Sequence, residues 1–86
     1  MRQGQPDLAE AVYRELLVRE PEAPNVRMNL ALAVVQQGRR EEALELYRAL
    51  ADGNEAYPEL AARARLASEL IQRQIDLDRA SSQGIR

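Results

Sequence analysis

Five pairs of residues repeat along the chain at a single spacing of 34 positions, with no insertion between them. The pairs are Gly4 and Gly38, Ala9 and Ala43, Tyr13 and Tyr47, Leu16 and Leu50, and Pro24 and Pro58. A period of 34 residues is the length of a helix-turn-helix unit, and such units stack side by side because each buries its apolar face against a neighbour. The period therefore predicts one complete unit over residues 24–57, with half a unit on either side.

The apolar residues between the repeated positions follow a helical spacing in every segment. They recur three or four positions apart, and proline, glycine or a polar turn separates one segment from the next. The pattern predicts helices over residues 6–20, 24–37, 40–52 and 58–80. We therefore expect an all-α fold of about four helices, arranged as antiparallel helix-turn-helix repeats. Residues 1–80 are assigned to one helical domain and residues 81–86 to a flexible tail.

The composition removes several classes of function. A chain of 86 residues has room for one small domain, and it contains no cysteine and no histidine. These are the residues most used as thiol nucleophiles, general bases and transition-metal ligands. The carboxylates follow the spacing of solvated helix faces, and no glycine-rich phosphate loop is present. We therefore expect no enzyme activity, no catalytic residue, no cofactor and no metal site.

The charge and hydropathy patterns argue against nucleic acid and membrane as partners. The formal net charge is −2, from 12 basic and 14 acidic residues, which gives no electrostatic basis for binding nucleic acid. The longest apolar run, residues 30–35, is far too short to span a bilayer. No signal segment is visible, which favours a cytoplasmic location. The location of a parent protein stays open, because the sequence could be a piece of a longer chain.

The repeated residues resemble the signature of the tetratricopeptide repeat. In that family a small residue closes the turn between the two helices, followed by an alanine, an aromatic residue and a further apolar residue in the second helix. The complete unit fills these places with Gly38, Ala43, Tyr47 and Leu50, and the half unit before it with Gly4, Ala9, Tyr13, Leu16 and Pro21. The resemblance covers about residues 4–75. It implies packing roles for these residues, with the glycine allowing a left-handed turn.

Some places depart from the family pattern. Arg27 stands where the family usually has tryptophan, and Val34 replaces a tyrosine, while Ala31 keeps a small-residue place. In the last helix Arg65 falls at the same small-residue place as Ala31. We therefore interpret the last helix as a terminal capping helix. The charged run at 39–42 is interpreted as exposed turn residues.

The resemblance also implies where a partner binds, because the first helices of such units line a concave groove. The predicted groove residues are Asn25, Met28, Asn29, Leu32, Val35 and Gln36 from the second helix, and Ala62, Arg63, Leu66 and Leu70 from the fourth. Members that clamp a C-terminal carboxylate use lysine and asparagine at two of these places, which Met28 and Leu32 occupy here. An amphipathic helix or an extended apolar segment fits such a groove better. The alternative is that the fourth helix covers Met28, Leu32 and Val35.

The first helix raises a second question, because it is a second-half helix without its partner. Its apolar edge requires a cover. An upstream repeat is the preferred interpretation, followed by a homodimer through this N-terminal helix, with local adjustment as the third.

The leading prediction for function is a protein–protein interaction scaffold that binds a protein or peptide partner. The alternatives are a self-association module and an accessory region of a larger bacterial protein. The stretch over residues 30–50 resembles the repeat tails that follow thioredoxin-like domains in some chaperones.

Overall fold

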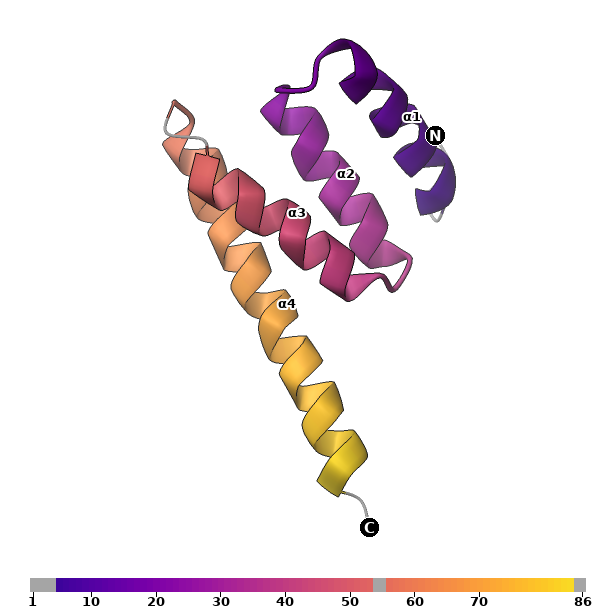
Figure 1. The fold of residues 1–86 in the computed structure, drawn as a ribbon, viewed down its shortest axis with the longest axis vertical. Coiled ribbons are helices and arrows are strands. Elements are labelled where there is room, and N and C mark those ends of the chain that lie inside the picture. Colours follow the sequence, from indigo (N-terminus) through magenta and orange to yellow (C-terminus); the bar gives the residue numbers. More distant parts are fainter. Residues whose placement is uncertain (1–4, 54–55, 85–86) are drawn as a thin grey trace.

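The computed structural model describes residues 5–53 and 56–84, and this part of the chain contains four helices and no strand. The helices are α1 (Pro6–Arg19), α2 (Pro24–Gln36), α3 (Arg40–Gly53) and α4 (Pro58–Gly84). Consecutive helices run in opposite directions and each packs against the next, so that α3 lies between α2 and α4 (Figure 1). The predicted all-α, antiparallel helix-turn-helix arrangement is confirmed.

Proline and glycine set the helix boundaries, as the sequence pattern predicts. A proline opens α1, α2 and α4, where its missing N–H costs nothing and its fixed φ already suits the helix. Gly38 closes the turn after α2 with a φ of 86°, a conformation that penalises any residue with a Cβ. Its N–H donates to the Val35 carbonyl at 3.0 Å. This turn therefore reverses the chain tightly between α2 and α3.

The hydrophobic core is centred on α3 and the faces of α2 and α4 that pack on it. It consists of Leu30, Ala31, Val34, Ala43, Leu44, Tyr47, Leu50, Leu60, Ala64, Ile71 and Ile75. The helix α1 contributes no fully buried residue, and only its Tyr13 and Leu17 pack partly against the core. Of the repeated residues, Ala43, Tyr47 and Leu50 are thus core residues in the complete unit, whereas in α1 Tyr13 packs only partly against the core and Leu16 is exposed.

The helix α4 ends at Gly84 instead of near Ala80, so residues 81–84, which the sequence assigned to a tail, continue the helix. Residues 85 and 86 lie outside the described part. Earlier in α4, two side-chain hydrogen bonds span single turns, from Gln72 to Asp76 and from Gln74 to Asp78. Arg40 of α3 also forms an ion pair with Asp78. These contacts support the turns of α4 that project beyond the other helices (Figure 1).

A polar network fastens α1 to the turn between α2 and α3. The Glu10 carboxylate accepts hydrogen bonds from Arg39 at 2.8 and 3.0 Å, from Gln37 at 2.7 Å and from Arg14 at 2.8 Å. Arg14 and Arg39 also bind Glu42, each at 2.9 Å. The prediction that the charges at 39–42 are simply exposed turn residues is wrong for Arg39, Arg40 and Glu42. All three are about half-exposed and paired, because α1 brings Glu10 to Arg39 and Arg14 to Glu42, while α4 brings Asp78 to Arg40.

The hydrogen bonds to Glu10 make α1 packing dependent on pH. The bond from Arg39, and then those from Gln37 and Arg14, lower the pKa of Glu10 from 4.5 to about 2. Because the folded-state pKa lies below the unfolded value, the stabilisation is complete above about pH 5 and is lost as the pH falls toward 2. We expect Glu10→Gln to lower the free energy of unfolding at pH 7 by about 1 kcal/mol, since its cationic partners are partly screened by solvent.

Urea denaturation of both proteins at several pH values checks this expectation. The difference in unfolding free energy between wild type and Glu10→Gln should shrink as the pH falls from about 5 to about 2. Glu15→Gln is the matched control, because Glu15 is an exposed residue of α1 that forms no ion pair with any described residue. A difference that stays constant over this pH range would show that Glu10 does not act through its ionised form.

Candidate functional site

A pocket lies where the N-terminal ends of α2 and α4 approach each other. Its volume is about 380 Å³, and it is lined by Asn25, Ala56, Tyr57, Pro58, Glu59, Leu60 and Arg63. Tyr57 is half-exposed and offers an aromatic surface, while Asn25 and Arg63 offer an amide and a guanidinium group. Such a set can hold an apolar side chain and the polar backbone of a bound segment. We call it the α2–α4 pocket.

The structure brings together only some of the predicted groove residues. Asn25 and Arg63 line the α2–α4 pocket. Ala62, Leu66 and Leu70 are exposed on α4, and Asn29, Leu32 and Gln36 are exposed on α2. Met28 and Val35 instead pack partly against the core.

For the apolar residues of α2 the sequence left two alternatives, an open groove or cover by the fourth helix. Neither alternative applies to all three side chains. Leu32 is 47% exposed, so α4 does not close over it. Met28 and Val35 are partly buried at the edge of the core. Within this stretch of α2, Met28 and Val35 thus pack partly against the core, whereas Leu32 lies on the surface.

Sequence reasoning missed Tyr57 as a site residue. The repeat pattern assigns Tyr57 only to the end of the complete unit. The signal that could have identified it is the repeated proline, because Pro58 fixes the start of α4 and places the preceding residue beside the start of α2. An exposed tyrosine next to an arginine is a common composition of protein-binding surfaces.

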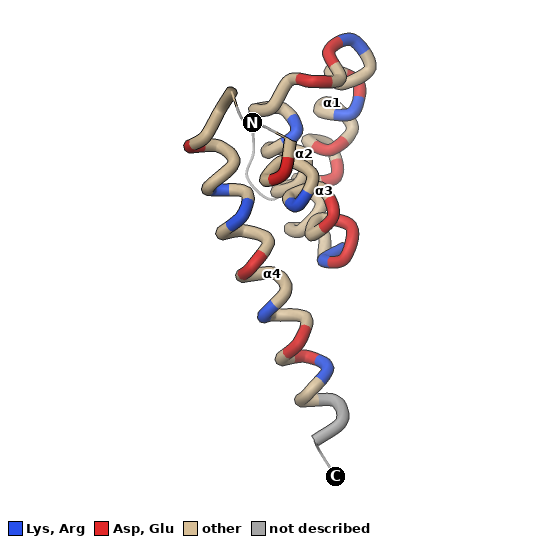
Figure 2. Tube along the Cα trace, turned by 60° about the vertical axis from the view of Figure 1, so that its left-hand side comes forward, with Lys and Arg blue, Asp and Glu red and all other residues tan. Residues whose placement is uncertain are grey.

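A line of exposed residues runs along α4 from the pocket toward its projecting end. We call Arg63, Leu66, Leu70, Arg73 and Leu77 the α4 stripe. The spacings between them alternate between three and four residues, so all five share one helix face. The three leucines are 55–57% exposed. Positive and negative residues are interspersed along the coloured part of α4 (Figure 2).

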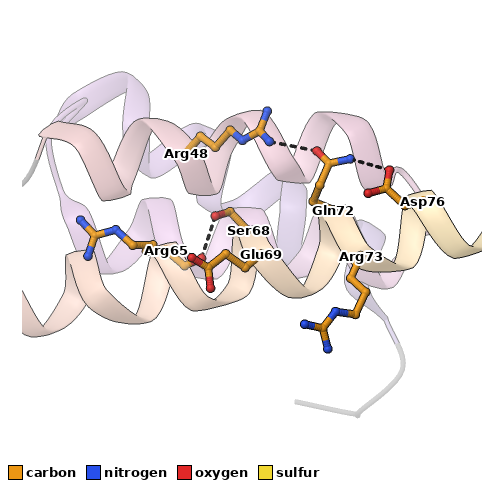
Figure 3. Close-up of a pocket in the computed structure, with 7 residues that line it drawn as sticks. All are labelled: Arg48, Arg65, Ser68, Glu69, Gln72, Arg73 and Asp76. Carbon is orange, nitrogen blue, oxygen red and sulfur yellow. Dashed lines mark hydrogen bonds between the residues drawn. The ribbon is translucent and has the colours of Figure 1, made fainter.

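A second, polar pocket of about 410 Å³ lies between α3 and α4 and is shown in Figure 3. It is lined by Arg48, Arg65, Ser68, Glu69, Gln72, Arg73 and Asp76. Arg48 donates to Gln72 at 2.9 Å, and Gln72 donates to Asp76 at 3.0 Å. The guanidinium groups of Arg65 and Arg73 point away from each other (Figure 3). The pocket therefore does not converge its cations on one point, and two carboxylates lie among them.

The helix α1 carries an exposed apolar edge, as the sequence predicts. We call Leu8, Val12 and Leu16 the α1 edge, and each of them is about half-exposed. Two shallow pockets lie along it, one lined by Val12, Glu15, Leu16 and Arg19 and the other by Leu16, Arg19, Glu20, Ala23 and Val26. In the complete unit, by contrast, Leu46 is partly buried and Leu50 fully buried. The difference arises because α3 packs against helices on both sides, whereas α1 packs only against α2.

The described side chains either pack in or against the hydrophobic core or lie on the surface. Among them, no three side chains of the metal-binding types cluster together. Burial raises the pKa of Tyr47, which lies in the core between α2 and α4. Within the described ranges, no helix is both long enough and apolar enough to cross a bilayer.

Comparison with protein families identifies the architecture. Residues 1–61 match the tetratricopeptide repeat family, which is more than half of the chain. Repeats of this family generally mediate protein–protein interactions and are typically non-catalytic. Comparisons with curated proteins and with solved structures gave no match. The matched region contains the two repeated glycines, the repeated tyrosines and the whole of α1, α2 and α3. The chain therefore belongs to the tetratricopeptide-repeat family.

Proposed function

We propose that the chain is an interaction scaffold that binds a peptide or helix of a protein partner across α2 and α4. The observation that carries the proposal is the exposure of Leu32, Leu66 and Leu70 on α2 and α4, the two helices whose N-terminal ends form the α2–α4 pocket. All three lie on first helices of the repeat units, and none is needed to complete the core. Exposed leucines on two neighbouring elements, rimmed by polar residues, are typical of a binding surface.

The surface offers both an apolar and a polar contribution to binding. Burying one leucine side chain fully contributes roughly 1.5–3 kcal/mol. The burial of two or three leucines can therefore supply a substantial part of the binding free energy. Tyr57 and Arg63 belong to the residue types that most often dominate binding energy. Asn25, on the opposite wall of the pocket, can hydrogen-bond the backbone of the bound segment.

A photo-crosslinking experiment tests this proposal. A crosslinking amino acid at position 70 should trap a specific protein from extracts of the organism that encodes the chain, whereas one at Ala49 on the exposed side of α3 should not. The trapped protein is then purified and its affinity measured. We expect Leu70→Glu to weaken binding at least about tenfold, because it places a charge where a leucine is buried.

Ala49→Glu is the matched control for that measurement, since it adds the same charge to an exposed helix position away from α4. Circular dichroism should show that both variants keep the helical content of the wild type. Binding that is unchanged in both Leu70→Glu and Leu32→Glu would rule out this surface as the binding site.

A second function is favoured by the α1 edge. Val12 and Leu16 lie 34 positions before Leu46 and Leu50, of which Leu46 packs against the core of the complete unit and Leu50 lies within it. A helix of the α2 type therefore fits this edge, as part of an accessory repeat region in a larger protein. Self-association of two chains through α1 would bury the same residues.

A further inference from the structure

The α4 stripe combines leucines with two arginines that have no partner of their own. Among the described residues, neither Arg63 nor Arg73 forms an ion pair or a side-chain hydrogen bond. Arg14, Arg39 and Arg40, in contrast, each bind a carboxylate. The stripe is therefore an apolar surface with an uncompensated positive charge near each end.

Acidic residues on α4 do not neutralise these arginines. Glu59 and Glu69 precede Arg63 and Arg73 by four positions, a spacing at which helix ion pairs form. Neither pair is formed within the described part of the chain. Figure 3 shows the Arg73 side chain extended away from Glu69. Both guanidinium groups are consequently available to an outside carboxylate.

The geometry of the stripe suits a helix rather than an extended segment. Alternating spacings of three and four residues form the seam on which two helices pack side by side. The stripe covers 15 residues, from Arg63 to Leu77, which are 14 steps and so about 21 Å at about 1.5 Å per residue. All five residues of the stripe are exposed, and the last turns of α4 project beyond the other helices (Figure 1).

A second copy of α4 is a poor occupant for this surface. Parallel pairing in register places Arg73 against the same arginine of the other copy, which is a like-charge contact. The antiparallel register that pairs Leu66 with Leu77 places Arg73 against Leu70. In both arrangements the seam brings no carboxylate to Arg73, so these two leucine-pairing registers favour a partner helix of a different sequence.

We propose that the α4 stripe binds an amphipathic α-helix whose apolar seam is flanked by acidic residues. The inference rests on the proposed function and names the class of partner that this surface takes. Leucines of the stripe pack into the apolar seam of the partner helix. Carboxylates of that helix, about ten residues apart, pair with Arg63 and Arg73. Arginine forms strong, directional pairs with carboxylates. Such pairs select the partner and its orientation more than they add affinity.

Two synthetic peptides of about three heptads test the inference. Both carry leucines along one seam, and they differ only in having glutamate or lysine at the flanking positions. Fluorescence anisotropy measures their binding to the purified chain. We expect the glutamate peptide to bind about tenfold more tightly than the lysine peptide at low salt. This preference should fall at high salt, where exposed charges are screened.

Variants of the chain identify the residues responsible. The double variant Arg63→Gln/Arg73→Gln should remove most of the preference for glutamate. Arg65→Gln/Arg79→Gln makes the same change of charge on exposed α4 positions outside the stripe. This control variant should retain more of the preference for the glutamate peptide than Arg63→Gln/Arg73→Gln does. Leu70→Glu should abolish binding of the glutamate peptide.

The possible results separate the inference from the proposed function. Equal binding of the two peptides, lost in Leu70→Glu, overturns the acidic partner but leaves the apolar binding surface standing. Binding of neither peptide overturns the helical partner, while photo-crosslinking at position 70 still decides whether the surface binds a protein. A dimer in sedimentation that Leu77→Glu dissociates would show that a second copy occupies the stripe, which also overturns the inference.

Discussion

Replacing Leu50 by alanine is expected to lower the free energy of unfolding by about 3 kcal/mol, the middle of the range for large core side chains. Leu50 has no exposed surface and lies on α3, the helix that packs against both α2 and α4. Truncation leaves a cavity that two neighbouring helices must relax to fill. A domain of this size has a total stability of only about 5–15 kcal/mol, so chemical denaturation followed by circular dichroism should show a large shift.

Leu16→Ala is the matched control for Leu50→Ala. It makes the same chemical change one repeat earlier, but Leu16 is 43% exposed because α1 packs against α2 alone. We expect a loss below about 1 kcal/mol, since little new cavity is formed. A loss as large as that of Leu50→Ala, growing with protein concentration and accompanied by dimers in sedimentation, would show instead that the α1 edge is buried between two copies.

The period of 34 residues predicted the four helices and most of the core because both depend on local signals. Proline and Gly38 mark boundaries through the conformations that each residue allows. The repeated alanine, tyrosine and leucine of α3 then occupy the same face of a helix, so they enter the core together. Only the extent of burial differs between the two copies, because burial also depends on how many helices surround each one.

The contacts that the sequence did not predict join residues far apart in the chain. Glu10 and Arg39 are 29 positions apart, and nothing in their local patterns distinguishes a paired charge from a solvated one. The sequence also did not decide which apolar side chains of α2 are buried. Whether Met28 or Leu32 is covered depends on how α4 crosses α3, which is set by the sizes of all the packed side chains.

The candidate site was predicted in part for the same reason. Equivalent repeat positions placed Asn25 and Arg63 on first helices, and the structure places both in one pocket. Tyr57 completes that pocket from the loop before α4, where the repeat pattern specifies little. The end of α4 was placed too early, at about Ala80, because the small and polar residues at 81–84 suggested a tail, although the helix continues through them to Gly84.

Arg65 occupies the place in α4 that Ala31 occupies in α2, 34 residues earlier. Ala31 has no exposed surface, because neighbouring helices pack closely over it. Arg65 is exposed and lines the polar pocket between α3 and α4. The same repeat position is thus a close helix contact in one unit and a solvated charge in the other. The difference arises because, within the described chain, α2 packs against α1 and α3, whereas no further helix packs over the Arg65 side of α4.

Exchanging the two residue types should therefore have opposite effects. We expect Ala31→Arg to cost at least about 4 kcal/mol and to leave much of the chain unfolded, because it forces a charge and a long side chain into a packed core. Arg65→Ala should change the stability by no more than about 0.5 kcal/mol, as is usual for exposed positions. Circular dichroism and urea denaturation measure both. A folded, stable Ala31→Arg protein would mean that α1 or α3 can move away from α2, and that the stack is less tightly closed than its buried alanine indicates.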